Sequence, residues 1–160
     1  MLNKDYMLRA IELAKKGCGY TAPNPMVGAV IVKDNRIIGE GYHEKYGDLH
    51  AERNAIKHCK ESVMKDMEDA SKGLLDKAIK ESMSGATIYV TLEPCCHHGK
   101  QPPCVDAIIE AGISRVVIGS RDPNPLVSGK GAAILREHGI EVIEDFMREE
   151  CDAINPVFFH

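Results

Sequence analysis

The second half of this 160-residue chain alternates between short apolar strands and helical segments, and this order constrains the fold more than any other feature. Residues 86–92, 115–119 and 140–143 have the apolar, β-branched character of buried strands. Helix patterns at 105–111 and 131–138 lie between them, and each is followed by a glycine. Strands separated by helices pair in parallel through right-handed crossovers. The second half therefore predicts a parallel sheet covered by helices.

The first half carries a helix pattern and then two adjoining strand patterns, at residues 4–16, 26–32 and 36–42. Asp34-Asn35 is a turn signal, so the two strands should form an antiparallel hairpin. His50 opens another helix, and residues 145–154 form a last one. We expect one α/β domain over residues 1–160, with a three-layer α/β/α arrangement and a mixed, mostly parallel five-stranded sheet.

Residues 61–84 are charged and contain few strong core residues. Their apolar positions predict two short amphipathic helices interrupted at Ser71-Lys72-Gly73. A solvated helical excursion is the favoured interpretation, and a subunit contact or a lid over a site is the alternative.

Composition excludes several classes of protein. The net charge of -4 leaves no basic surface that would indicate nucleic acid as a partner. No apolar run approaches the length of about 18 residues that a membrane span requires, and the N-terminus does not have the pattern of a signal peptide. Three of the six cysteines cluster in a proline-rich segment, which indicates metal binding in a reducing cytosol. We expect a cytoplasmic protein.

Two segments supply the residues of a candidate metal site. His50-Ala51-Glu52 brings an imidazole and a carboxylate, and Pro94-Cys95 followed by Cys104 brings two thiolates. Three such ligands suit Zn²⁺ and leave the fourth position open for water, as in catalytic zinc sites. Glu52 would then move protons and must not bind the metal itself.

Hydrolytic deamination fits this set of groups. Zinc in a protein brings the pKa of its water to about 7, and one carboxylate can carry protons from water to a ring nitrogen and to departing ammonia. The pattern H-x-E…P-C-x-x-C is the signature of zinc deaminases. Here the position three residues after Cys95 is His98, so His98 and Cys104 are both candidates for the third ligand. A closed zinc knuckle of Cys95, Cys96, His98 and Cys104 is a further alternative.

Geometry limits where these residues can lie. Residues two apart point in nearly opposite directions in mid-helix, so His50 and Glu52 can converge only at a helix start. Cys104 follows two prolines and opens a helix, whose N-terminus stabilises a thiolate. The site should therefore lie between two helix N-termini at the carboxyl ends of the strands.

Four segments together resemble one family. They are residues 22–30 (APNPMVGAV), His50-Ala51-Glu52, residues 91–104 (TLEPCCHHGKQPPC), and Asp122-Pro123-Asn124-Pro125 with Gly129-Lys130-Gly131. These strings, in this order, resemble the pyrimidine deaminase domain of the bifunctional riboflavin-biosynthesis proteins of RibD type, within the cytidine deaminase superfamily. The resemblance spans nearly the whole chain and implies a cytidine deaminase-like fold.

The resemblance also implies residue roles. His50, Cys95 and Cys104 would bind one Zn²⁺ per chain, and Glu52 would be the proton shuttle. The substrate would be 2,5-diamino-6-ribosylamino-4(3H)-pyrimidinone 5′-phosphate, deaminated to the 5-aminouracil analogue. The residues implied to contact it are Asn24, His43, His97, Lys100, Asp122 and Asn124.

The chain departs from the family pattern at two places that matter here. Cys96 stands where serine is usual, and we interpret it as a bystander. The chain stops at residues 155–160, about where the family's reductase domain begins. We therefore expect no nicotinamide cofactor and a reductase domain in cis or in trans. We also expect a homo-oligomer. Another zinc deaminase, acting on cytidine, dCMP or a tRNA adenosine, is the alternative enzyme, and a non-catalytic zinc module is the alternative outside enzymes.

Overall fold

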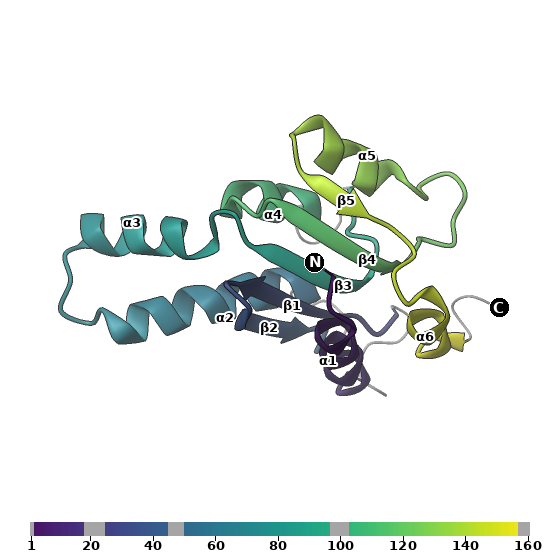
Figure 1. The fold of residues 1–160 in the computed structure, drawn as a ribbon, viewed down its shortest axis with the longest axis horizontal. Coiled ribbons are helices and arrows are strands. Elements are labelled where there is room, and N and C mark those ends of the chain that lie inside the picture. Colours follow the sequence, from purple (N-terminus) through teal and green to yellow (C-terminus); the bar gives the residue numbers. More distant parts are fainter. Residues whose placement is uncertain (1, 18–24, 45–49, 97–102, 157–160) are drawn as a thin grey trace.

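The computed structural model describes residues 2–17, 25–44, 50–96 and 103–156. Within these residues it contains a five-stranded sheet in the order β2-β1-β3-β4-β5 (Figure 1). The strands are β1 Gly28–Lys33, β2 Arg36–Tyr42, β3 Thr87–Leu92, β4 Arg115–Ser120 and β5 Glu141–Ile143. All five strands were predicted from the sequence.

Strand β1 runs opposite to the rest of the sheet. It pairs antiparallel with β2 and with β3, whereas β3, β4 and β5 pair in parallel. Strands β2, β3, β4 and β5 therefore point the same way, which confirms the mixed, mostly parallel sheet. The carboxyl ends of β2, β3 and β4 consequently lie on one edge of the sheet, together with the start of β1.

Helices cover both faces of this sheet, which confirms three layers. Their bounds are α1 Lys4–Lys15, α2 Ala51–Asp66, α3 Lys72–Met83, α4 Cys104–Ala111, α5 Lys130–Glu137 and α6 Arg148–Ala153. On one face α1 and α6 pack on Val30, Tyr89 and Val117. On the other face α2, α4 and α5 pack on Ile88 and Val116 and their neighbours. The sheet is therefore buried between two apolar cores, as expected for strands that read as continuous apolar runs.

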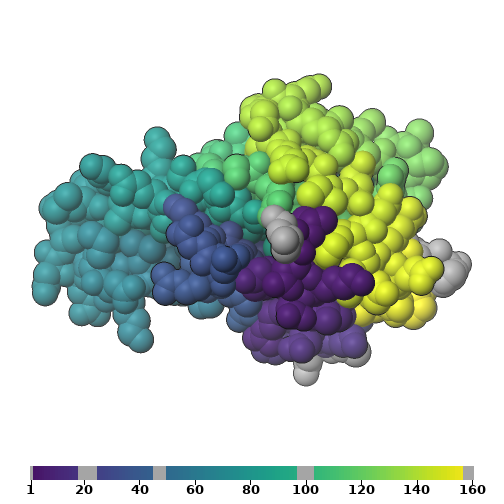
Figure 2. Space-filling view, in the orientation of Figure 1, coloured from purple at the N-terminus to yellow at the C-terminus, as the bar shows by residue number. Residues whose placement is uncertain are grey.

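Helices α2 and α3 form an antiparallel arm that extends beyond the sheet, seen as the teal lobe in Figure 2. The predicted break at 71–73 is close to the observed one, since Ser71 caps α3 by accepting a hydrogen bond from the Leu74 N–H. The first of the two predicted helices is not separate, because α2 continues from its start near His50 to Asp66. Among the described residues α3 buries only Met83 fully, so most of the arm is solvated.

The last helix begins later than predicted. The sequence predicted residues 145–154, whereas α6 starts at Arg148. Asp145 and Met147 have positive φ angles of 62° and 56°, which a right-handed helix does not permit. Within the part of the chain that the structure describes, no helix is long and apolar enough to cross a membrane.

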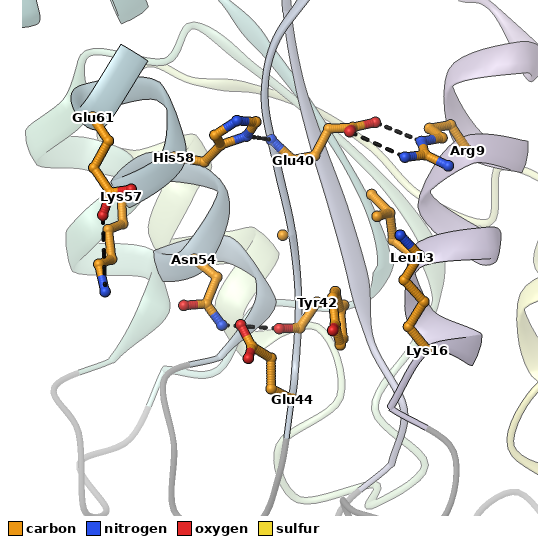
Figure 3. A pocket seen from close by; sticks show the side chains of 11 residues that line it. Arg9, Leu13, Lys16, Glu40, Tyr42, Glu44, Asn54, Lys57, His58 and Glu61 are labelled. Carbon is orange, nitrogen blue, oxygen red and sulfur yellow. Dashed lines mark hydrogen bonds and ion pairs between the residues drawn. The ribbon is translucent and has the colours of Figure 1, made fainter. Parts of the chain in front are cut away.

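Strand β2 is held between α1 and α2 (Figure 3). Arg9 of α1 binds the Glu40 carboxylate through two N–H groups, at 2.6 and 3.2 Å. From α2, the Asn54 side chain donates to the Tyr42 carbonyl. A Cβ at Gly41 would collide with the α2 backbone at Ala55, so only glycine permits this approach. The close packing fixes the N-terminus of α2 beside the end of β2.

Candidate active site

His50 and Glu52 lie at the start of α2, as the spacing argument required. His50 is the N-cap residue, with an extended backbone at φ -70° and ψ 163°. Glu52 lies in the first turn and is only 4% exposed. The change from extended to helical backbone between them allows both side chains to face the same region.

Cys95 and Cys104 come from a second pair of elements. Cys95 follows β3, and Cys104 is the first residue of α4. The Cys104 backbone N–H donates to the Cys95 sulfur at 3.2 Å, so the N-terminus of α4 stabilises a thiolate on Cys95. The Arg53 guanidinium donates to the Pro103 carbonyl at 3.1 Å and joins the starts of α2 and α4.

The structure brings these three side chains into one cluster. His50 Nδ1 lies 3.2 Å from Cys104 Sγ and 3.6 Å from Cys95 Sγ, and the three ligand atoms all lie within 4.8 Å of one another. Ligands of one tetrahedral zinc ion lie about 3.4–3.8 Å apart, given zinc–ligand bonds of about 2.1–2.3 Å. The spacing and the donor types therefore fit Zn²⁺.

The ionisation of the two sulfurs supports the same assignment. Hydrogen bonds from Cys104 and His50 lower the pKa of Cys95 to about 4. Cys104 has a raised pKa, first because its thiol hydrogen-bonds to Cys95 and then because it is buried near Glu52. Two adjacent thiolates repel each other, and a divalent cation between them would favour both as thiolates.

Glu52 has the properties of a proton carrier. Its burial, and then the charge on Cys95, raise the pKa of its carboxyl to about 7. A carboxyl that titrates near neutral pH can both accept and release a proton.

Three of the residues predicted to contact the substrate belong to the described part of the chain, and all three follow strands that end on the side of the sheet where the cluster lies. His43 follows β2, is buried, and has its ring centroid 5.5 Å from that of His50. Asp122 and Asn124 lie in the loop after β4, where the Asp122 carboxylate accepts a hydrogen bond from the Asn124 N–H. Asn124 is exposed, and no contact places it against the cluster. The substrate residues Asn24, His97 and Lys100, and the alternative ligand His98, lie outside the described residues.

Cys96 lies next to the cluster but is not part of it. The metal-binding group found among the described residues contains His50, Cys95 and Cys104. Cys96 is instead partly buried and packs against the apolar core on the side of the sheet that α2, α4 and α5 cover. This arrangement favours an open three-ligand site over a closed knuckle.

Two residues at this edge were missed in the sequence. The Glu93 carboxylate is buried and accepts hydrogen bonds from the backbone of the loop after β4. Asn155 binds the backbone of Met26 twice, donating to its carbonyl at 2.8 Å and accepting from its N–H at 2.7 Å. Both residues act on partners far away in the sequence, so local patterns carry no signal for them, although Glu93 lies within the quoted motif.

Comparison with known proteins agrees with this geometry. Residues 2–120 match the family described as the cytidine and deoxycytidylate deaminase zinc-binding region. The chain is 46% identical to a diaminohydroxyphosphoribosylamino-pyrimidine deaminase of Buchnera aphidicola, over 99% of this chain and 95% of that protein. It is 58% identical over its whole length to the riboflavin biosynthesis protein RibD of Actinobacillus pleuropneumoniae.

A solved structure gives the same result. The diaminohydroxyphosphoribosylaminopyrimidine deaminase/5-amino-6-(5-phosphoribosylamino)uracil reductase of Thermotoga maritima superposes with a TM-score of 0.81 at 52% identity, over 97% of this chain. This chain spans 39% of the Thermotoga protein and 37% of the Actinobacillus RibD. The long family match and the nearly end-to-end alignment with the Buchnera enzyme show that the chain belongs to the zinc-binding cytidine and deoxycytidylate deaminase family, in the group of the RibD-type pyrimidine deaminases.

Proposed function

We propose that this chain hydrolyses 2,5-diamino-6-ribosylamino-4(3H)-pyrimidinone 5′-phosphate to 5-amino-6-ribosylaminouracil 5′-phosphate and ammonia. The observation that carries the proposal is the cluster of His50, Cys95 and Cys104 beside the buried Glu52. It occurs in a chain that aligns nearly end to end with a protein named for this deamination.

The cluster would hold one Zn²⁺ per chain through His50 Nδ1 and the two sulfurs. Zinc supplies a water of lowered pKa when it is bound. Glu52 would take one proton from the attacking water and pass it to the ring nitrogen, while the water oxygen adds to the ring carbon that bears the amino group. Glu52 would then move the proton of the added hydroxyl to the amino nitrogen, so that the carbonyl forms, the carbon–nitrogen bond breaks and ammonia leaves. Glu52 suits both directions of transfer because its pKa is about 7.

Substrate binding would use residues on the edge of the sheet around the cluster. His43, Asp122 and Asn124 follow strands that end there. Asn24 and Lys100 supply an amide and a cation, and Lys100 would pair with the phosphate. His97 completes the set that the family motifs imply.

The reduction that follows would be carried out by a reductase domain in cis or in trans, so that residues 1–160 act as the deaminase domain without a nicotinamide cofactor. We place the reaction in the cytoplasm, where the cysteines that are free in the described part of the chain, at positions 59, 95, 96, 104 and 151, would stay reduced. A homo-oligomer remains our expectation.

An ammonia-release assay tests the proposal. The phosphoribosyl diaminopyrimidinone is compared with cytidine and with dCMP at equal concentrations. We expect turnover of the first and at least about a hundredfold lower kcat/KM for the others, because their rings present different groups to a polar site. Preferred turnover of cytidine or dCMP would refute the substrate assignment.

A matched pair of cysteine variants tests the metal site. Cys95→Ser should lose zinc and activity, since it removes a thiolate ligand. Cys96→Ser changes the neighbouring cysteine in the same way and should retain both. Zinc content by atomic absorption separates the two variants, and equal zinc loss in both would favour the closed knuckle.

A further inference from the structure

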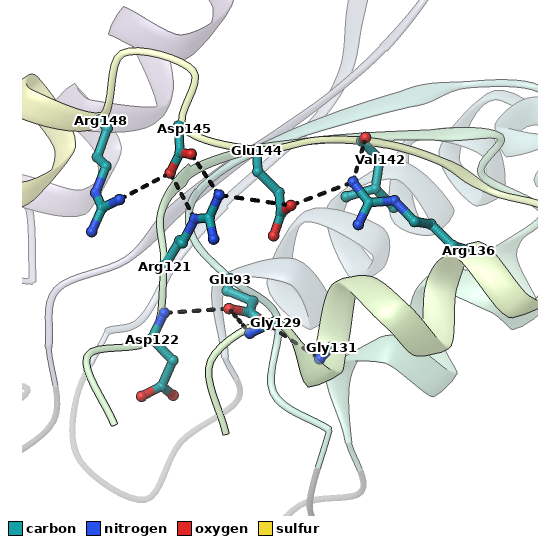
Figure 4. Close-up of polar contacts among 10 residues, drawn as sticks. All are labelled: Glu93, Arg121, Asp122, Gly129, Gly131, Arg136, Val142, Glu144, Asp145 and Arg148. Atoms are coloured by element: carbon teal, nitrogen blue, oxygen red, sulfur yellow. Dashed lines mark hydrogen bonds and ion pairs between the residues drawn. The ribbon is translucent and has the colours of Figure 1, made fainter. Parts of the chain in front are cut away.

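Glu93 is a buried carboxylate whose hydrogen bonds go to backbone N–H groups. It follows the carboxyl end of β3 and is 7% exposed. Glu93 Oε1 accepts from the N–H groups of Asp122 and Gly129 at 3.3 and 3.0 Å, and Oε2 accepts from that of Gly131 at 3.1 Å (Figure 4). Both carboxylate oxygens of Glu93 therefore accept hydrogen bonds.

These donors lie at the two ends of the loop that joins β4 to α5. Asp122 lies at the start of this loop, Gly129 is its last residue, and Gly131 lies in the first turn of α5. Inside the loop, the Asp122 carboxylate accepts from the Asn124 N–H and the Asn124 side chain accepts from the Leu126 N–H. The loop is thus braced internally, and Glu93 holds both of its ends.

Glu93 is also close in the sequence to the cluster of His50, Cys95 and Cys104. Glu93 is followed by Pro94 and by Cys95, one of the three clustered side chains. The start of α5, into which the loop leads, also touches this segment, since a Cβ on Gly131 would collide with the Pro94 carbonyl oxygen. Glu93 therefore links the segment that bears Cys95 to the loop that bears Asp122 and Asn124.

A carboxylate at this position has a specific consequence. Burying an ionised carboxylate is unfavourable unless it is well hydrogen-bonded. Three donors converge here, and a carboxylate has acceptors on both oxygens and no donor. Glutamine would place an N–H₂ group against at least one backbone N–H and would release one side of the loop.

We propose that Glu93 is a positioning residue for the deamination, one that sets the distance between residues 122–131 (the loop and the start of α5) and the cluster of His50, Cys95 and Cys104. The proposal rests on the proposed function for its substrate. Glu93 acts through the loop and does not touch the reacting atoms, so its loss should weaken substrate binding more than it slows the chemical step.

The test compares Glu93→Gln with Glu144→Gln. Glu144 also lies near this loop, but its carboxylate pairs with Arg136 at 3.4 Å and approaches Arg121, not the loop backbone (Figure 4). We expect Glu93→Gln to raise KM for the phosphoribosyl diaminopyrimidinone about tenfold or more, the range for loss of a supporting partner of a site. Its zinc content should be unchanged and kcat should fall less than KM rises. Glu144→Gln should keep the wild-type KM.

A rescue variant separates positioning from stability. Glu93→Asp keeps an acceptor-only carboxylate on a shorter stem, so its KM should lie between those of wild type and Glu93→Gln. A wild-type KM in Glu93→Gln, whatever its Tm, would overturn the proposal. So would an equal rise in KM in Glu144→Gln.

Amide hydrogen exchange of the wild-type protein gives a readout that needs no variant and no turnover. The N–H groups of Gly129 and Gly131 should exchange far more slowly than those of an unstructured chain, and exchange at unprotected rates would overturn the proposal. Wild-type turnover of cytidine or dCMP alone would refute the substrate assignment instead, and the KM comparison would then use that substrate.

Discussion

Two buried glutamates each lie two residues from a clustered side chain, yet their surroundings differ. Glu52 follows His50, and its carboxyl has a pKa raised to about 7 because burial strips it of water. Glu93 precedes Cys95, and its two oxygens accept three backbone hydrogen bonds. The contrast teaches that burial and closeness to the cluster of His50, Cys95 and Cys104 do not by themselves define the role of a glutamate. Their hydrogen-bond partners separate the two roles that we propose, with Glu52 as a proton carrier and Glu93 as a residue that positions a loop.

The largest difference between the two glutamates should appear in turnover. Glu52→Gln removes the proton carrier and should lower kcat by about 10²–10⁴-fold, the usual contribution of a general acid–base group. Zinc content should stay at the wild-type level, because the proposed ligands are His50, Cys95 and Cys104 and not Glu52. Steady-state ammonia release measures the effect, and a kcat within threefold of wild type would remove the distinction between the two glutamates.

Removal of zinc should test, through the free energy of unfolding, whether Glu52 is a metal ligand. A bound ion stabilises the folded state by about 2.7 kcal/mol at a hundredfold excess over Kd. Chelation should therefore lower the free energy of unfolding of wild type and of Glu52→Gln alike. Urea unfolding with and without chelator measures this, and a Glu52→Gln variant that is insensitive to the chelator would place Glu52 among the ligands.

A smaller effect is expected from Gly131, where the Glu93 loop meets Pro94. Gly131→Ala forces the two backbones apart and should cost about 1–3 kcal/mol, as overpacking does. Gly73→Ala on the arm is the control, because a Cβ there meets nothing within 4 Å. It should leave stability unchanged or raise it by up to about 1 kcal/mol. Equal effects in urea unfolding would argue against a tight contact at Gly131.

The smallest effect concerns a glutamate that is paired with an arginine. The hydrogen bonds from Arg9 lower the pKa of Glu40. The stability that this pairing contributes is therefore present above the unfolded-state pKa of about 4.3 and is lost as pH falls through the folded-state pKa. Glu40→Gln should cost about 1 kcal/mol at pH 7, and the difference from wild type should shrink as the pH is lowered below 4.

The control for Glu40 is Glu12, which pairs with the same arginine at 3.0 Å but has a side chain that is 67% exposed. Glu12→Gln should cost less than about 0.5 kcal/mol at pH 7. A Glu40→Gln difference that does not change with pH would show that packing, not charge, is lost.

The fold was predictable because apolar residues recur with different spacings in its strands and in its helices. The alternation after residue 86 indicated a parallel sheet, and the structure has it. The helix starts of His50 and Cys104 were expected at one edge of the sheet, and the family resemblance selected Cys104 over His98 as the ligand beside His50 and Cys95. The end of α2 was missed because residues 57–66 carry little apolar signal and continue a helix begun by the core. The start of α6 was missed because positive φ angles at Asp145 and Met147 are not encoded by glycine.

Glu93 and Asn155 show what a single sequence does not reveal about the site. Each is a polar residue near the end of an element, and either could have been a surface residue. Their partners are backbone groups, which any residue supplies, so no second sequence position marks the pairing. Only the fold shows that these side chains are buried and that the backbone groups they bind lie on the side of the sheet where the cluster lies.

The pairing of Asn155 with Met26 has a consequence for how the protein acquires its shape. The two residues are 129 positions apart, so the segment leading into β1 is held by a part of the chain that is synthesised much later. Contacts of such long range slow folding, because a large loop must close before they form. On the ribosome, the start of β1 would therefore have to wait for α6 to emerge before this anchor could form.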